Sequence, residues 1–434
     1  MKPTPAEALP PVEGFYGSVG KDYWVRDKWG IWIPLNESSI RRHLRAHGLS
    51  PECPRDETLS EVEDALHHFQ MGCSVMYAGP LAGCPAGPTE QCGNRILVTA
   101  GPKLIEPHPG NFPLLEKLLE NLFWEPGVDQ RPYVLGWLKI AIESLRAQHL
   151  RPGQALAMAG PKKCGKSLFQ QIITELLGGR SAKAYRYMSE GTEFNGELMG
   201  AEHLMVEDDV AGKDIRARRT FGARIKDITV NQVQSCHAKH RQALSLRPFW
   251  RLSISLNDEP ENLQILPPFD ESVTDKIMLL RANKRDMPMP TVTPEQRDQF
   301  WNALMSELPA FVDHLLHWEI PQHLRCERFG ITHYHDPELL ADIDGMSPES
   351  KLLALIDAEV FNGPTVTTWT GSAEQLEKLL VNSGSGHAAR RLLDWTNATG
   401  TYLGRLAVAH RERITQERTK SARLWTIRPP WVTR

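Results

Sequence analysis

Residues 160–167 constrain the fold of this chain more than any other segment, and they read Gly-Pro-Lys-Lys-Cys-Gly-Lys-Ser. An apolar run typical of a buried strand, ALAMA, precedes them, and an amphipathic pattern typical of a helix, SLFQQIITELLGG, follows. A glycine-rich turn between a strand and a helix points backbone N–H groups and the positive end of the helix dipole at phosphate. The sequence therefore predicts a phosphate-binding loop made of Gly160, Pro161, Lys162, Lys163, Cys164, Gly165, Lys166 and Ser167.

Two residues of this loop are expected to take part in chemistry, with ATP and Mg²⁺ as the ligands. Lys166 is expected to bridge the β- and γ-phosphates, and Ser167 to ligate the metal. We interpret Cys164 as a small tolerated residue, although a thiol here would also make the loop sensitive to thiol reagents.

Further along the chain, an apolar strand beginning at His203 ends in three carboxylates, Glu207, Asp208 and Asp209. In a phosphate-loop ATPase such a strand is expected beside the phosphate loop. The first acid then holds Mg²⁺ and the next polarises the attacking water. We assign Glu207 to the metal and Asp208 to the water, with Asp209 as the alternative for either role.

Residues 249–257, FWRLSISLN, predict a third strand, which ends at Asn257. An amide at that place can hold the attacking water near the γ-phosphate, and Ser255 is the weaker candidate for this role. Before it, two strand-like arms at 228–233 and 242–246 flank SCHAKHR, which contains Lys239, His240 and Arg241. We predict a β-hairpin whose basic tip suits a phosphodiester backbone, a solvated turn without a partner being the alternative.

Short apolar strands that alternate with helices indicate an α/β protein with a mostly parallel sheet. We predict three domains: a small α+β N-terminal domain (1–125), a phosphate-loop ATPase domain (126–335) and a basic C-terminal domain (346–434). The N-terminal domain is expected to contain a hairpin around Asp27–Gly30, two helices and a Gly/Pro-rich loop at 79–94. A polar connection at 333–350 is expected to precede helices near 347–361, 372–382 and 386–398 and two final strands.

Composition limits the kinds of partner. The net charge is −3, so a nucleic-acid surface must be a local patch. The seven cysteines are scattered, which favours a reducing, cytoplasmic environment over a disulfide framework. No run of about 18 apolar residues occurs, so we expect no membrane-spanning helix.

The order of these elements resembles superfamily 3 helicases. A phosphate loop, a strand ending in Glu-Asp, a basic hairpin with Lys-His and a strand ending in Asn follow one another, and residues 130–320 carry the likeness. More narrowly, they resemble the helicase part of the D5-like (DUF5906-like) primase-helicases of phages and plasmids, without a primase signature. The resemblance implies an AAA+-type hexameric ring whose hairpins line a pore and track one DNA strand.

The resemblance also implies roles for individual residues. Lys239 and His240 match the Lys-His tip, and Lys226 matches a lysine that reaches the phosphates of a neighbouring subunit. Where the family usually places an arginine finger this chain has Lys276. Lysine lacks the planar fork of arginine, so the finger is one of three residues: Lys276, Arg281 or Arg285.

The C-terminal segment is predicted to be a winged helix that binds duplex DNA. Helices are followed there by two strands joined by a basic turn, and the DNA contacts are expected from Arg413, Arg418 and Lys420. A winged helix that docks protein instead of DNA is the alternative.

Taken together, the sequence predicts an ATP-driven DNA helicase or translocase of a phage, plasmid or other mobile element. Two alternatives use the same fold. One is a non-unwinding ATPase switch that assembles, senses DNA or loads another enzyme, for example in phage defence. The other is an origin-binding initiator. The expected partners are DNA, further copies of the chain and a separate primase or other replication protein.

Overall fold

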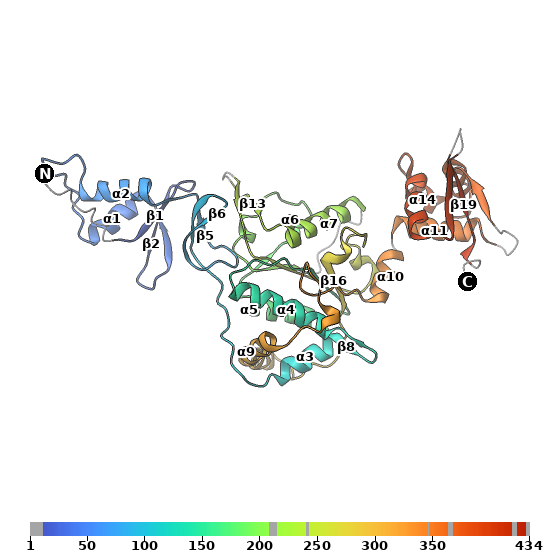
Figure 1. The fold of residues 1–434 in the computed structure, drawn as a ribbon, viewed down its shortest axis with the longest axis horizontal. Helices are drawn as coiled ribbons and strands as arrows, with labels where there is room; N and C mark the ends of the chain where they lie inside the picture. The colour runs from blue at the N-terminus through green and yellow to red at the C-terminus, as the bar shows by residue number, and fades with distance from the viewer. Residues whose placement is uncertain are drawn as a thin grey trace. The chain divides into compact units, whose positions relative to one another are not determined.

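The computed structural model describes residues 12–207, 215–239, 243–345, 347–362, 368–418 and 423–430. The chain forms two compact units, one ending at Asp336 and the other beginning at Pro337 (Figure 1). Throughout this described part of the chain, no helix has both the length and the apolar character that a membrane crossing requires.

The first unit is built on a five-stranded sheet in the order β11-β12-β15-β10-β16. Every neighbouring pair is parallel, which confirms the predicted α/β core. The order corrects one expectation, because β15 separates the acidic strand β12 from β10, which leads into the phosphate loop. The strands are β10 (Ala155–Ala159), β11 (Ser181–Lys183), β12 (His203–Glu207), β15 (Arg251–Leu256) and β16 (Ile277–Arg281).

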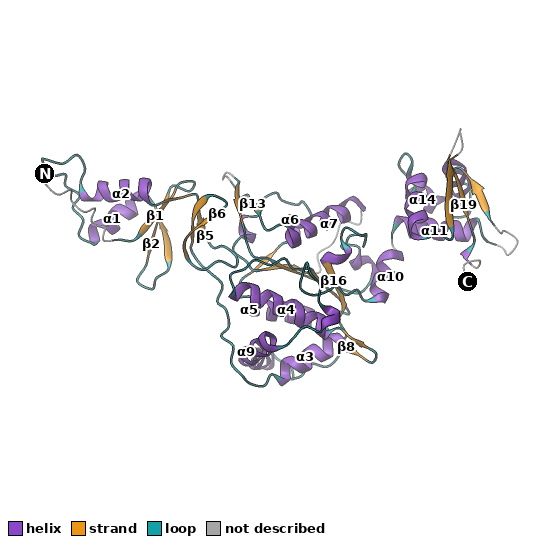
Figure 2. Cartoon of the chain, in the orientation of Figure 1, coloured by secondary structure: helices purple, strands orange, loops and turns teal. Residues whose placement is uncertain are grey.

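Helices cover both faces of this sheet (Figure 2). On one face α3 (Pro113–Phe123), α4 (Arg131–Arg146), α5 (Lys166–Leu176) and α9 (Pro294–His317) share one apolar core with β10 and β16. The sequence division at 125 placed α3 in the N-terminal domain, yet its leucines pack in this central core. The other face carries α6 (Tyr185–Met188) and α7 (Ile215–Val230). Short elements complete the unit: β8 (Trp124–Glu125), β9 (Val128–Asp129), α8 (Pro260–Leu263), η1 (Gly196–Leu198), η2 (Thr274–Lys276) and η3 (Gln322–Leu324).

The basic hairpin is formed by β13 (Gln234–Cys236) and β14 (Leu244–Leu246), which pair antiparallel. Its first arm begins later than predicted, because residues 228–230 belong to helix α7. Phe221, Ile225 and Ile228 are buried at helical spacing. Their burial outweighs the β-propensity of the Ile-Thr-Val run.

The N-terminal region contains a four-stranded sheet, order β3-β2-β1-β4, with the predicted hairpin as β2 (Asp22–Arg26) and β3 (Trp32–Leu35). β1 (Gly14–Gly17) and β4 (Ser74–Val75) complete the sheet, and α1 (Glu37–Ala46) and α2 (Glu61–Gly72) pack on it. Trp32 is buried, whereas Trp29 is 73% exposed.

A second small sheet has the order β5-β7-β6, and its strand β6 lies within the segment predicted to be a Gly/Pro-rich loop. Its strands are β5 (Tyr77–Gly79), β6 (Gly87–Gln91) and β7 (Asn94–Val98). β6 and β7 are joined through Cys92 and Gly93, whose φ angles are 51° and 75°. Positive φ at both central residues is the geometry of a tight hairpin turn, so β6 and a two-residue turn replace the second half of the predicted loop.

The second unit contains α10 (Pro337–Gly345), α11 (Pro348–Glu359), α12 (Ala373–Val381), α13 (Gly386–Leu392) and α14 (Ala398–Ala409). Helix α10 lies where only a polar connection was expected, and the helix predicted at 386–398 ends at Leu392. A sheet of order β17-β19-β18 completes the unit, with β17 (Trp369–Gly371), β18 (Ile414–Arg418) and β19 (Arg423–Ile427). The winged-helix assignment stays a prediction.

Candidate functional site

The candidate site lies at the carboxyl edge of the parallel sheet. In the register of the strands Glu207 pairs with Ser255, and Ala159 pairs with Leu256. The N–H of Gly160 donates to the carbonyl of Leu256 at 3.2 Å. The phosphate loop, the first predicted acid and the end of the sensor strand therefore lie at one edge, which is where ligands bind in open α/β sheets.

Two glycines shape the loop. A Cβ on Gly160 would lie 2.1 Å from the carbonyl oxygen of Ala282, so the strand end can pass β16 only without a side chain. Gly165 precedes helix α5 with a φ of 112°, a left-handed conformation that favours glycine. These constraints let the backbone turn sharply into the helix N-terminus, as phosphate binding requires.

Lys166 is buried at the start of α5, and its ammonium donates to the carbonyls of Gly160 at 2.7 Å and Pro161 at 2.9 Å. The loop thus holds the cation against its own backbone. Ser167 is exposed, and its hydroxyl has no hydrogen-bond partner among the described residues. Cys164 is buried in the apolar core.

The acidic strand end contributes Glu207, whose carboxylate lies 3.2 Å from the ammonium of Lys183 at the end of β11. The sequence offered no signal for Lys183, because it belongs to a strand of three residues, which is too short to recognise. Asp208 and Asp209 lie outside the described residues. A serine hydroxyl and a carboxylate at one sheet edge are the oxygen ligands that Mg²⁺ prefers, so Ser167 and Glu207 fit the predicted metal.

Asn257 follows β15 directly and is 8% exposed. Within the described part of the chain its amide makes no hydrogen bond, which leaves it able to orient a molecule at the sheet edge. Ser255 is more deeply buried and lies opposite both Met158 and Glu207 in the sheet. Of the two predicted candidates, Asn257 is therefore the one placed at the edge.

A buried polar network beneath the site was missed by the sequence reasoning. The hydroxyl of Ser253 accepts from the amide of Gln170 at 2.8 Å and lies 2.7 Å from Nε2 of His203. The other ring nitrogen of His203 lies 2.8 Å from the hydroxyl of Thr174. These contacts join α5, β12 and β15, the three elements that carry the phosphate loop, Glu207 and Asn257.

Of the three candidates for the trans-acting finger, one lies at the amino edge of the sheet and two lie at or beyond the carboxyl end of β16. Lys276 immediately precedes β16 and therefore lies at the amino edge, away from the phosphate loop of its own chain. Its ammonium pairs with Asp275 at 2.5 Å. Arg281 ends β16 at the carboxyl edge and pairs with the buried Asp336 at 3.1 Å. Arg285 lies beyond it and donates to the carbonyl of Trp124 at 2.9 Å.

Lys226 lies close to the segment that carries Lys276. Its ammonium donates to the hydroxyl of Ser272, four residues before Lys276. Arg328 also reaches this segment and pairs with Asp275 at 2.8 Å. The structure therefore gathers Lys226, Lys276 and Arg328 at the amino edge, a grouping that spacing in the sequence does not reveal.

The predicted DNA contacts are partly described. Lys239 is exposed near the tip of the hairpin, and it has no ion-pair partner among the described residues. His240, Arg241 and Lys420 lie outside those residues. Arg418 is exposed at the end of β18.

The structure corrects the prediction that Arg413 contacts DNA at the surface. Its side chain is 9% exposed and pairs with Asp357 at 2.5 Å, and its Nε donates to the carbonyl of Arg428 at 3.1 Å. The guanidinium is committed to holding α11 against the final strands, so it is a packing residue.

The comparisons with known proteins agree with this geometry. Residues 158–272 match the model of a family described as "Family of unknown function (DUF5906)". This central segment is DUF5906-like. The narrower of the two predicted resemblances, to DUF5906-like proteins, is thereby confirmed for this segment. No curated protein is similar enough in sequence to count as a relative.

Solved structures show that the likeness in fold extends over nearly the whole chain. "The apo structure of NrS-1 C terminal region (305-718)" matches with a TM-score of 0.58 at 13% identity, covering 96% of each chain. "The A form apo structure of NrS-1 C terminal region-CTR" gives a TM-score of 0.56 at 12% identity, also covering 96% of each. "SCCmec type IV Cch - active helicase" covers 93% of this chain and 74% of that chain at 10% identity, but its TM-score of 0.32 does not define a shared fold.

Proposed function

We propose that the chain hydrolyses ATP and uses the energy to move along DNA, as a helicase or translocase of a phage, plasmid or other mobile element. One observation carries this proposal. The phosphate loop, Glu207 and Asn257 lie at one edge of a parallel sheet. In the sequence, the basic hairpin lies between β12, which ends at Glu207, and β15, which Asn257 follows. A phosphate loop alone is compatible with many kinds of ATPase, whereas the basic hairpin supports a coupling of ATP hydrolysis to movement on a polyanion such as DNA.

In this proposal each residue of the site has a separate task. The loop N–H groups and Lys166 hold the phosphates, and Lys166 exchanges its loop carbonyls for phosphate oxygens. Ser167 and Glu207 would hold Mg²⁺, which would supply positive charge beside the phosphates. Asp208 accepts a proton from the attacking water, and Asn257 orients that water.

The position of a residue at one or the other edge of the sheet indicates whether it can act on a neighbouring subunit. In a ring of identical subunits each interface joins two different faces, so residues distant from their own phosphate loop can reach that of a neighbour. Lys226 and Lys276 meet this condition, because they lie at the amino edge. We propose a hexamer in which these lysines complete the neighbouring site, while Lys239, His240 and Arg241 face a pore that holds one strand.

A non-unwinding ATPase switch or an origin-binding initiator is the second candidate, favoured by one observation. Lys276 is paired with Asp275, and Arg281 is paired with Asp336. A finger held by its own chain supplies less charge to a neighbour, which suits slow hydrolysis. A winged helix in the second unit, with Arg418 on duplex DNA, would serve either candidate.

The proposal is tested by comparing unwinding with hydrolysis in one variant. Lys239→Ala with His240→Ala should abolish unwinding of a forked DNA and DNA-stimulated ATPase, while basal ATPase is unchanged. Lys378→Ala removes one exposed lysine from α12 and should leave both activities intact. Unwinding by the hairpin variant at the wild-type rate would remove the helicase function and leave the ATPase switch.

A further inference from the structure

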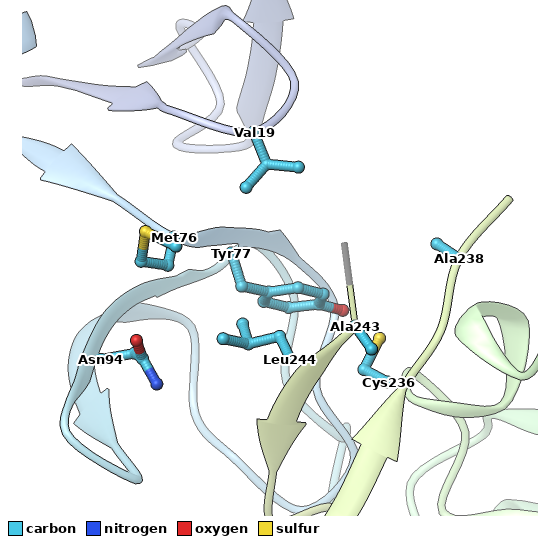
Figure 3. A pocket seen from close by; sticks show the side chains of 8 residues that line it. All are labelled: Val19, Met76, Tyr77, Asn94, Cys236, Ala238, Ala243 and Leu244. Atoms are coloured by element: carbon cyan, nitrogen blue, oxygen red, sulfur yellow. The ribbon is translucent and has the colours of Figure 1, made fainter. Parts of the chain in front are cut away.

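A pocket of about 210 Å³ lies between the small β5-β7-β6 sheet and the tip end of the basic hairpin (Figure 3). Its walls come from the β1–β2 turn, from β5 and β7, and from both arms of the hairpin. Two apolar side chains on its N-terminal side, Val19 and Met76, are unusually exposed, at 38% and 41%. The lining residues are Val19, Met76, Tyr77, Asn94, Cys236, Ala238, Ala243 and Leu244.

The aromatic ring of Tyr77 forms a fixed wall of this pocket. Its hydroxyl donates to the carbonyl of Pro80 at 2.7 Å. A Cβ on Gly79 would come within 2.8 Å of that hydroxyl, so glycine leaves the room that this orientation needs. Figure 3 places Val19 across the pocket from the ring, with Leu244 against its other side. An apolar space beside a fixed aromatic face suits a flat ring.

Polar groups at the pocket are few and specific. The side-chain amide of Asn94 donates once, to the carbonyl of Cys92 at 3.1 Å, which leaves its oxygen and a second N–H for a ligand. Lys239 directly follows the lining residue Ala238 and is exposed, without an ion-pair partner among the described residues. An aromatic wall, an amide and a neighbouring cation match the base, the base edge and the phosphate of one nucleotide.

We propose that this pocket binds one unpaired nucleobase of the DNA strand whose phosphates the hairpin contacts. The proposal rests on the proposed function and adds a base contact that involves the N-terminal region. The pocket is continuous with the basic hairpin, which favours a nucleotide over an apolar side chain of a protein partner. Because every base has a π-face, the contact discriminates weakly between sequences but strongly between DNA with and without bases.

The test compares an oligothymidine with an abasic oligonucleotide of equal length, each binding the full chain in fluorescence anisotropy. Stacking on an aromatic side chain contributes about 1–3 kcal/mol for a base, so the wild type should prefer the oligothymidine by at least about fivefold. Tyr77→Leu removes the aromatic face, and Ala243→Trp fills the pocket. Both should bring the ratio of the two affinities close to one, whereas Val292→Trp, at an exposed site outside the pocket, should keep it.

A second measurement does not depend on variants. Ultraviolet crosslinking of an oligonucleotide that carries 5-iodouracil, followed by peptide mapping, should label Tyr77 or Met76. Failure to label the pocket, together with an unchanged affinity ratio in both variants, overturns the proposal.

The two proposals fail in different ways. If the wild type binds both oligonucleotides equally well, and Lys239→Ala weakens both to the same extent, the base pocket is wrong and the DNA motor stands. If the wild type binds neither, the proposed function and the pocket are both wrong. If oligothymidine does not bind but an apolar peptide binds at this pocket, the pocket docks protein and the base proposal is wrong.

Discussion

The imidazole of His203 on β12 lies 2.7 Å from the hydroxyl of Ser253 on β15, and its other nitrogen lies 2.8 Å from Thr174 on α5. Burial lowers the pKa of this histidine to about 3, so the ring is neutral near pH 7. A neutral ring can donate through one nitrogen and accept through the other, which is what a link between two hydroxyls needs. His203 therefore fixes the acidic strand relative to the phosphate-loop helix.

The first prediction concerns pH and this histidine. The unfolded chain takes up a proton on His203 near pH 6.5, whereas the folded chain does so only near pH 3. In that window the unfolded state binds more protons, so stability falls as the pH falls, by about 1.4 kcal/mol per pH unit from this group. His203→Asn should lower stability at pH 7.5 but flatten the dependence between pH 6.5 and 5. Urea unfolding measures both, and His67→Asn on the exposed face of α2 should leave the slope unchanged.

The second prediction concerns the phosphate loop. Lys166→Ala should abolish ATP hydrolysis, because Lys166 supplies the cation for the transferring phosphate. It also removes the bonds to the carbonyls of Gly160 and Pro161, so nucleotide binding should weaken too. Steady-state ATPase and titration with a fluorescent nucleotide measure the two effects. Lys117→Ala, whose exposed side chain on α3 lies 2.8 Å from Glu120, is the matched control and should keep most activity.

The third prediction separates the acids at the end of β12. Glu207→Gln should raise the Mg²⁺ concentration that half-maximal activity needs. Asp208→Asn should leave ATP binding intact, stop hydrolysis and stabilise the assembled oligomer. Magnesium titrations and sizing chromatography with ATP distinguish these outcomes. If Asp209→Asn alone is damaging, the assignment is wrong by one residue.

Much of the core could be predicted because its signals are local. The spacing of the glycines between a strand and a helix is enough to recognise the phosphate loop. In the structure, Gly160 leaves room for Ala282 and Gly165 has a positive φ, so both positions favour glycine. The strand that ends at Glu207 and the strand that ends at Asn257 are apolar runs with polar ends. In such cases the residues that form the element also mark where it ends.

Other features could not be predicted because they depend on contacts between distant segments. The position of β15 between β10 and β12 is set by tertiary packing, so the expected neighbours were wrong. Arg413 looked like part of a basic surface, and only its partner Asp357, 56 residues away, shows that it is buried. The pocket beside Tyr77 lies where the small β5-β7-β6 sheet meets the hairpin, and no sequence motif includes both segments.

The fourth prediction tests which finger acts between subunits. Lys276 lies at the amino edge, whereas the segment of Arg285 runs past its own loop, since Met287 packs against Gly165. Mixing Lys166→Ala subunits with Lys276→Ala subunits should therefore restore ATPase activity. In a randomly mixed ring about a quarter of interfaces have both an intact loop and an intact finger, so about a quarter of wild-type activity is expected at equal amounts. If Lys276 is the finger, Arg285→Ala subunits keep both the loop and the finger and should be active without mixing. An inactive Arg285→Ala variant whose activity returns on mixing with Lys166→Ala subunits would make Arg285 the finger instead.

The last prediction separates packing from DNA binding in the second unit. Arg413→Ala leaves Asp357 without its partner and should destabilise the unit by about 2 kcal/mol, because the pair is largely shielded from water. Its duplex affinity, measured below the melting transition, should stay close to wild type. Arg418→Ala should leave the melting temperature unchanged but weaken duplex binding, and it should reduce the slope of log affinity against log salt by about 0.9, as one lost phosphate contact does. Lys351→Ala, an exposed lysine on α11, serves as the charge-matched control for both measurements. Equal affinity and salt slope for Arg418→Ala and the wild type would mean that this unit docks protein, and the duplex contact would have to be sought elsewhere in the chain.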